Sequence, residues 1–273
     1  MKKQIWLSAV IFVAVWFSTG FNNQLIAQSE LRIQAPTTWM WAGSYGMIRI
    51  GERTYWDAQF HYRTINTDNV PYVGRLVQIY NRHAINYRVN DQFRVALGGV
   101  MRLNFAAERD NPMIKYLRPE PRIWHEYIWA MKPVGRVIAY HRIRIEHRWS
   151  IGNSVNADWL YRDRWRYKFF LMIPINKERL VPGAYYFAPD VEIITQTGRD
   201  SRASFMEDLR FYPQVGYIHS PRLKFGAAMM YTMGQQISNP FELNSRWVLR
   251  LNVYWAIDAR KFEDKIPISN YFD

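Results

Sequence analysis

Charged and apolar residues alternate with a period of two over residues 140–149, and this pattern constrains the fold more than any other feature. Successive side chains of a β-strand point to opposite faces. One face of this segment therefore carries Arg142, Arg144, Glu146 and Arg148, and the other face is largely apolar. In a helix the same charges would be spread around the circumference, so no apolar face would be left to bury. The pattern predicts a strand.

The pattern recurs over residues 160–173. One face of this second segment is basic, with Arg162, Arg164, Arg166 and Lys168. The other face holds Trp165, Tyr167, Phe169 and Leu171. A soluble β-sandwich would bury its apolar face and expose the charged one, but an aromatic apolar face recurs in nearly every segment of this chain. Aromatic outer faces combined with polar inner ones are typical of transmembrane barrels.

The N-terminus has the parts of a secretory leader. Lys2 and Lys3 precede an apolar run over residues 5–17, and small and polar residues follow. The run is too short for a spanning helix, which needs roughly 20 apolar residues. We therefore predict a signal peptide over residues 1–27, with the small residues at 18–20 as an alternative cleavage site, and a location in the outer membrane of a Gram-negative-type bacterium.

The composition argues against some partners and excludes some kinds of site. The net charge is +13, but nucleic-acid binding needs basic residues clustered on one exposed face, and here they alternate with aromatic residues along strands. No long apolar run follows the leader, so only a barrel of strands can span a bilayer. We expect outer-membrane lipid and no nucleic acid as a partner. The sequence has no cysteine, which excludes disulfides and thiolate metal ligands.

Read with a period of two, the mature chain divides into eleven segments separated by turn signals. These segments are residues 38–50, 53–65, 73–88, 91–104, 121–131, 136–149, 160–173, 184–196, 205–218, 222–234 and 243–258. Single-chain bacterial barrels have even strand numbers. We therefore favour 12 strands, with residues 31–36 as a short additional strand, over the alternative of 10. The predicted fold is all-β, a transmembrane antiparallel β-barrel over residues 28–261 with a periplasmic tail over 262–273.

The polar face of each strand is assigned to the lumen. An Arg or Lys facing lipid near the bilayer midplane would cost roughly 2–4 kcal/mol, and several together would exceed the roughly 5–15 kcal/mol stability of a typical domain. The predicted lumen and selectivity residues are Arg142, Arg144, Glu146, Arg148, Arg162, Arg164, Arg166, Lys168, Glu192, Arg210 and Arg250. The predicted lumenal acids are Asp57, Glu126, Glu146, Asp190, Glu192 and Asp208. Five tryptophans are expected to face lipid, namely Trp56, Trp149, Trp165, Trp247 and Trp255.

An arginine-rich lumen is compatible with two functions that the sequence leaves open. In the first, Arg and Glu side chains satisfy one another across a closed barrel, which serves as a structural or accessory subunit of a larger outer-membrane complex. In the second, the surplus positive charge attracts small anions or acidic saccharides into a porin-like channel, as charged rings select ions in other pores.

A lipid hydrolase in the barrel wall is a third hypothesis. Such an enzyme needs a nucleophile and a base close together at the outer edge. His141, His147 and Ser150 are near in sequence, but the two histidines lie roughly 20 Å apart along a strand. No residues have metal-ligand spacing, and no phosphate loop or nucleophile elbow is present. We predict no catalytic residues, no metal and no cofactor.

Several residues also resemble a known family. The two arginine strands read Arg142-x-Arg144-x-Glu146-x-Arg148 and Arg164-x-Arg166-Tyr167, and the softer matches are Gln78, Arg82, Tyr87, Gly98, Glu192, Arg210, Gly216 and Tyr217. Over roughly residues 38–258 the sequence resembles the uncharacterised outer-membrane β-barrel family grouped as domain of unknown function 2490. The resemblance implies an outer-membrane barrel and implies no activity.

Overall fold

The structure is a computed structural model that describes residues 31–198, 204–236 and 239–260. The predicted signal peptide, residues 1–27, and the predicted tail, residues 262–273, lie outside the described residues. In the described part of the chain, no helix has the length and apolar character needed to cross a bilayer.

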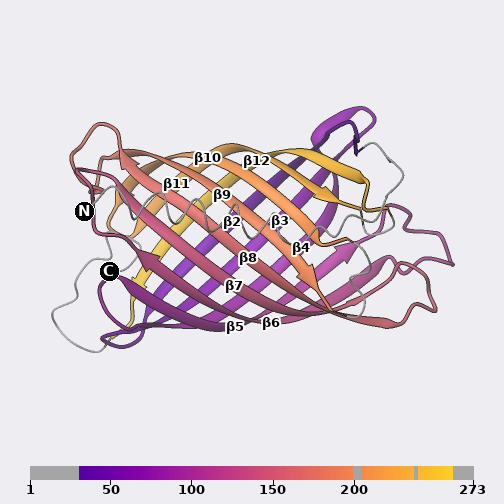
Figure 1. Ribbon diagram of the computed structural model, residues 1–273, viewed down its shortest axis with the longest axis horizontal. Helices are drawn as coiled ribbons and strands as arrows, with labels where there is room; N and C mark the ends of the chain where they lie inside the picture. The colour runs from indigo at the N-terminus through magenta and orange to yellow at the C-terminus, as the bar shows by residue number, and fades with distance from the viewer. Residues whose placement is uncertain (1–30, 199–203, 237–238, 261–273) are drawn as a thin grey trace, which may run out of the picture. The chain divides into compact units, whose positions relative to one another are not determined.

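The described residues form twelve strands, which Figure 1 shows as arrows tilted around a barrel. Each of the eleven predicted segments overlaps one strand from β2 to β12. The strands are β1 (Arg32–Ile33), β2 (Thr37–Arg49), β3 (Thr54–Thr67), β4 (Val70–Arg88), β5 (Phe93–Phe105), β6 (Leu117–Ala130), β7 (Ile138–Ile151), β8 (Trp159–Pro174), β9 (Tyr185–Thr197), β10 (Met206–Ser220), β11 (Leu223–Gln235) and β12 (Glu242–Asp258).

Eleven strands close the barrel, so the prediction of an even, wholly antiparallel wall is wrong. Strands β2 to β12 pair in chain order, each antiparallel to the next. The last strand then pairs with the first in parallel, from Arg246 opposite Thr37 to Asp258 opposite Arg49. An odd number of alternating strands leaves the first and last running in the same direction, and their pairing is a parallel seam.

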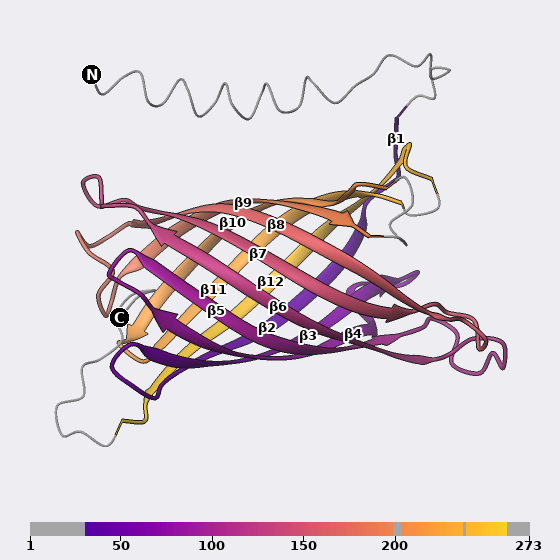
Figure 2. The ribbon, with the colours of Figure 1, turned by 60° about the horizontal axis from the view of Figure 1, so that its bottom comes forward.

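The predicted extra strand exists but does not add a place to the wall. Strand β1 pairs in parallel with the start of β12, Arg32 opposite Glu242 and Ile33 opposite Leu243. Strand β2 follows along the same partner from Arg246 onward, so the two strands lie in succession along β12 (Figure 2). Pro36, between them, has no N–H to give to a ladder, which explains the interruption.

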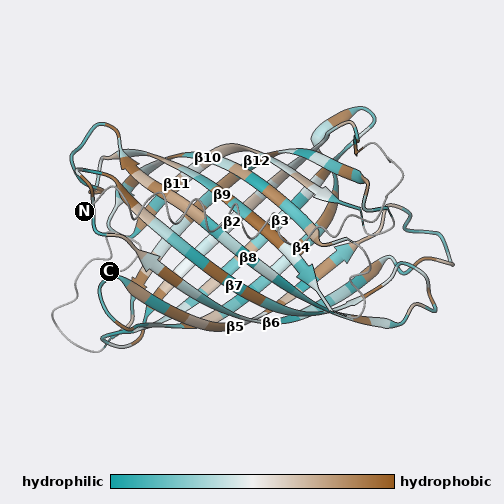
Figure 3. Ribbon diagram, in the orientation of Figure 1, coloured by the Kyte–Doolittle hydropathy of each residue, from teal (hydrophilic) through white to brown (hydrophobic). Residues whose placement is uncertain are grey.

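Side chains sort by the period of two along the wall, and Figure 3 shows the resulting alternation of hydropathy along the strands. Three of the five predicted outward tryptophans, Trp56, Trp165 and Trp247, are exposed on the outer surface. Trp149 packs against exposed Tyr161, with ring centroids 5.3 Å apart. The indole of Trp255 donates to Ser44 Oγ across the seam at 2.9 Å.

Candidate functional site

A cavity of about 920 Å³ lies inside the barrel and is lined by residues from both ends of the strands. Asn104 and Arg118 border it near the 106–116 connection, and Arg222 and Lys224 border it near the β10–β11 turn. Among the lining side chains, Arg and Lys outnumber Asp and Glu more than two to one. The barrel therefore encloses a cationic space that extends along its axis.

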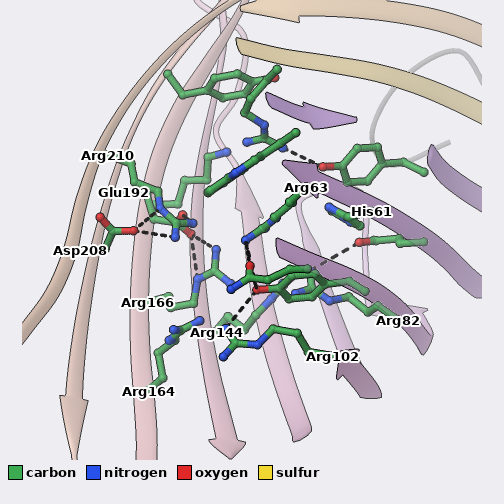
Figure 4. A pocket seen from close by; sticks show the side chains of 18 of the residues that line it. His61, Arg63, Arg82, Arg102, Arg144, Arg164, Arg166, Glu192, Asp208 and Arg210 are labelled. Atoms are coloured by element: carbon green, nitrogen blue, oxygen red, sulfur yellow. Dashed lines mark hydrogen bonds and ion pairs between the residues drawn. The ribbon is translucent and has the colours of Figure 1, made fainter. Parts of the chain in front are cut away.

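The structure brings the predicted lumen residues together in this space. Nine of them line the cavity, namely Arg142, Arg144, Arg162, Arg164, Arg166, Lys168, Glu192, Arg210 and Arg250. The other two, Glu146 and Arg148, are buried beside it. Figure 4 shows several of these arginines projecting from neighbouring strands toward one another.

Glu146 on β7 is the centre of an ion-pair network. Its carboxylate is completely buried and accepts hydrogen bonds from Arg122 and Arg166, at 2.7 and 2.6 Å. Arg164 lies 3.4 Å from the same carboxylate. These arginines come from the two strands that flank β7, because the register sets Trp124 and Arg164 opposite Glu146. One carboxylate thus bridges three strands.

The network continues around the barrel through other carboxylates. Glu192 on β9 accepts from Arg142 at 2.5 Å and from Arg166 at 2.7 Å, and Arg210 lies 3.2 Å away. Glu126 pairs with Arg144 at 2.5 Å. We call this side, defined by Glu120, Glu126, Glu146, Glu192 and Glu207 with their arginines, the paired wall.

Sequence reasoning missed two acids of the paired wall. Glu120 precedes the predicted segment 121–131, but β6 begins at Leu117, and Glu120 pairs with Arg102 and Arg122. Glu207 is absent from the predicted lumenal acids, because strict alternation from Asp208 and Arg210 would point it outward. A register shift between Met206 and Asp208 turns it inward, where it binds Arg148 through both oxygens, at 3.1 and 2.8 Å. An irregularity of this kind leaves no signal in the alternation of the sequence.

Another side of the lumen, on β2, β3, β4 and β12 with Tyr212 of β10, holds its arginines with aromatic rings. The Arg63 guanidinium lies 3.6 Å from the ring centroid of Trp41 and 4.2 Å from that of Tyr80. The Arg250 guanidinium lies 4.3 Å from the ring centroid of Tyr212 and donates to Tyr45 Oη at 2.7 Å. We call this side, defined by Trp41, Tyr45, Tyr80, Tyr212, Arg63, Arg82 and Arg250, the aromatic wall.

The basic residues of the aromatic wall lack carboxylate partners. Within the described residues, no Asp or Glu lies within ion-pair distance of Arg63, Arg82 or Arg250. Arg63 donates to Gln78 and Tyr80 instead, at 3.2 and 3.1 Å. A guanidinium held by rings and neutral oxygens keeps its full charge, and the cation–π contact contributes about 0.5–2 kcal/mol. Part of the surplus positive charge of the cavity lies here.

The candidate hydrolase residues are not brought together. Ser150 is buried on the lumenal side, where it accepts a hydrogen bond from Arg162 at 3.2 Å. His147 lies on the outer side and pairs with Asp163, Nδ1 to Oδ1, at 2.6 Å. Among the residues that the structure describes, no cluster of His, Asp and Glu has the arrangement of a metal site.

Comparison with known proteins gives a family and no activity. A family model described as protein of unknown function (DUF2490) matches residues 38–242. No curated protein and no solved structure matches the chain. The match covers strands β2 to β11, which include both walls of the lumen except for the residues that β12 contributes.

Proposed function

We propose that this chain, which belongs to the family of proteins of unknown function DUF2490, is an outer-membrane barrel that conducts small anions or acidic saccharides through its lumen. The outer surface supports insertion into a bilayer. Large apolar side chains are exposed on strands β3 to β12 of the wall, among them Phe60, Leu97, Ile123, Phe211 and Leu251. In water these side chains would expose contiguous apolar surface, whereas lipid covers it without cost.

The single observation that carries the channel proposal is the cavity with its excess of basic residues. A cation inside a low-dielectric wall attracts anions more strongly than the same cation on a surface. The arginines of the aromatic wall form no ion pair with a carboxylate of the described residues, so their charge is available to a passing ion. Basic residues line the cavity near both ends of the strands, Arg118 at one end and Arg222 at the other, and they would attract an anion along it.

Planar bilayers test this proposal. The full chain is reconstituted in a gradient of potassium chloride. Its reversal potential is expected to lie close to the equilibrium potential of chloride. Arg246→Glu reverses one charge of the lining and should shift the reversal potential toward that of potassium. Arg53→Glu changes an exposed residue of the β2–β3 turn and serves as the matched control. Absence of conductance, or potassium selectivity in the wild type, would refute the channel.

A second candidate function, a closed barrel that serves as an accessory subunit, is favoured by the apolar cluster near the β6–β7 turn. Ile128, Ala130, Tyr140 and Phe170 pack together inside the barrel and fill part of its cross-section. A partner would bind the outer aromatic face or the connections 106–116 and 236–241. Co-purification of a stoichiometric partner in mild detergent, together with absent conductance, would support this function over the channel.

No enzymatic activity is part of the proposal. His147, with Asp163 beside it, is the outer histidine best placed to act as a base, but the described residues offer no serine next to it. Lipid turnover by the purified protein that is lost in His147→Ala would contradict this and reopen the hydrolase hypothesis.

A further inference from the structure

Two arginines flank one tryptophan across the parallel seam. Arg250 on β12 is directly opposite Trp41 on β2, and Trp41 is directly opposite Arg63 on β3. The guanidinium groups of Arg63 and Arg250 lie 3.6 and 5.6 Å from the indole centroid. His61, two residues before Arg63, contacts Tyr45 edge-on with ring centroids 4.9 Å apart. These five residues, Trp41, Tyr45, His61, Arg63 and Arg250, line the same cavity and are called the seam site.

Four of these residues present buried nitrogen atoms that lack a hydrogen-bond partner in the described structure. The atoms are Trp41 Nε1, His61 Nε2, Arg63 Nε and Arg250 Nε. Buried polar groups are nearly always paired, because an unpaired one costs about 1–3 kcal/mol. On the paired wall, Arg148 Nε also lacks a hydrogen-bond partner in the described structure, but there Glu207 compensates the same guanidinium. At the seam site unpaired donors and uncompensated charge coincide.

The chemistry of these atoms selects the ligand. The guanidinium and indole groups are hydrogen-bond donors only, and the imidazole is a donor through its N–H. A ligand for them must be an acceptor and an anion. Guanidinium forks bind carboxylate and phosphate with comparable geometry, but a carboxylate has two oxygens and a phosphate group has at least three. Unpaired donors from four residues that line one cavity are better matched by the larger set of oxygens.

We propose that the seam site binds a phosphate group, either as free phosphate or as part of a phosphorylated saccharide. The inference rests on the proposed channel, because the ligand reaches the seam site through the lumen. It also moves the specific site away from the arginine-rich strands β7 and β8. On those strands Arg142, Arg144, Arg148, Arg164 and Arg166 pair with carboxylates. Arg63 and Arg250 are held instead by rings, phenols and an amide oxygen.

Binding is measured by titration calorimetry on the full chain in detergent at constant ionic strength. Inorganic phosphate is the first probe, glucose 6-phosphate the second and acetate the third. Arg63→Gln and Arg250→Gln are each expected to weaken phosphate binding about ten-fold or more, the effect of losing one charged hydrogen bond. Lys224→Gln, which removes a different cavity charge, is the matched control and should change the affinity by less than about two-fold.

Further variants and ligands separate the outcomes. Arg63→Lys keeps the charge and loses the fork, so binding that is lost in Arg63→Gln and only partly restored in Arg63→Lys supports a fork-held phosphate. Glucose 6-phosphate binding more tightly than phosphate identifies a saccharide ligand, and equal affinity identifies the free ion. Unchanged phosphate binding in both glutamine variants, or acetate binding as tight as phosphate, would overturn the site. Heat-modified gel mobility checks that each variant has folded.

The same variants distinguish failure of the seam site from failure of the channel. In bilayers, phosphate should block the chloride current of the wild type and should block Arg63→Gln at about ten-fold higher concentration. A chloride current that phosphate does not affect would refute the seam site and leave the channel intact. Phosphate binding that depends on Arg63, in a protein that conducts no ions, would refute the channel and retain the seam site.

Discussion

The two walls of the lumen bury arginine by different means. On the paired wall each guanidinium is matched by a carboxylate, as Arg122 and Arg166 are by Glu146. On the aromatic wall Arg63 and Arg250 are matched by an indole, phenols and an amide oxygen. Both arrangements supply hydrogen bonds to the buried cation, but only a carboxylate cancels its charge. The electrostatic character of a lumen therefore depends on the partners of its arginines and not on their number.

The two walls should also differ in how much their arginines contribute to stability. Removing one member of a buried ion pair leaves the other charge uncompensated, which costs about 3–5 kcal/mol. Removing an arginine that aromatic rings hold leaves only neutral groups behind. The loss in the free energy of unfolding is then about 0.5–2 kcal/mol, the contribution of a cation–π contact. The paired wall should therefore dominate stability, and the aromatic wall should dominate interaction with anions.

The largest effect on stability is expected for Glu146→Gln. Three arginines converge on this carboxylate, and the variant leaves them facing one another at the centre of the paired wall. We expect a loss of about 3–5 kcal/mol in the free energy of unfolding, measured by urea titration of the reconstituted barrel. Glu178→Gln, at an exposed position between β8 and β9, should lose less than about 0.5 kcal/mol. Equal losses in the two variants would contradict the network.

Glu207→Gln should have the next largest effect. Glu207 pairs with Arg148 and Arg164, but its side chain is 21% exposed, so water screens part of the interaction. The expected loss is about 2 kcal/mol in the same urea titration. Asp110→Asn in the exposed 106–116 connection is the control. A stability equal to that of the wild type would show that the irregularity in β10 does not turn Glu207 into the lumen.

Trp41→Leu tests the aromatic wall itself. Leucine keeps apolar volume but removes the ring that Arg63 and Arg250 contact, so a loss of about 1–2 kcal/mol is expected. Trp247→Leu, on the exposed outer face, is the matched tryptophan and should lose less. If the outer variant is the less stable of the two, ring contacts do not hold these arginines.

Arg63→Gln is expected to have the smallest effect of these substitutions on stability and the largest effect on anion selectivity. No carboxylate among the described residues loses a partner, so the unfolding free energy should fall by less than about 1 kcal/mol. Arg166→Gln should show the reverse, because Glu146 and Glu192 both lose a partner. Urea titration measures the stability of both variants, and reversal potentials measure their anion selectivity. If the same variant shows the larger loss in both measurements, the two walls do not have separate roles.

Much of the fold follows from the period of two. It predicts eleven strands and the inward side of every residue named for the lumen. The predicted extra strand is present, but the number of strands in the closed wall was wrong, because the even-number rule assigned residues 31–36 a place there. Which edge a short strand joins depends on the partner strand, and β1 lies along the same edge of β12 that β2 uses.

The candidate site was predictable only in part. Arg63 and Arg250 fall on polar faces, but nothing in the alternation separates them from Arg142 or Arg166. The distinction comes from Trp41, which lies in a segment that is apolar on both faces and so carries little periodic signal. Glu207 was missed for a related reason, because a one-residue irregularity reverses the inward face without changing composition.

By itself, then, the order of residues along each strand determines which side chains enter the lumen, since alternation is a local property of extended backbone. Tertiary structure decides which of them meet. Arg210 lies 5.3 Å from the ring of Trp41, although the two residues are far apart in the chain, because closure of the wall brings β10 to face β2. Whether a lumenal arginine finds a carboxylate or an indole is set by register and closure, and these depend on all eleven strands at once.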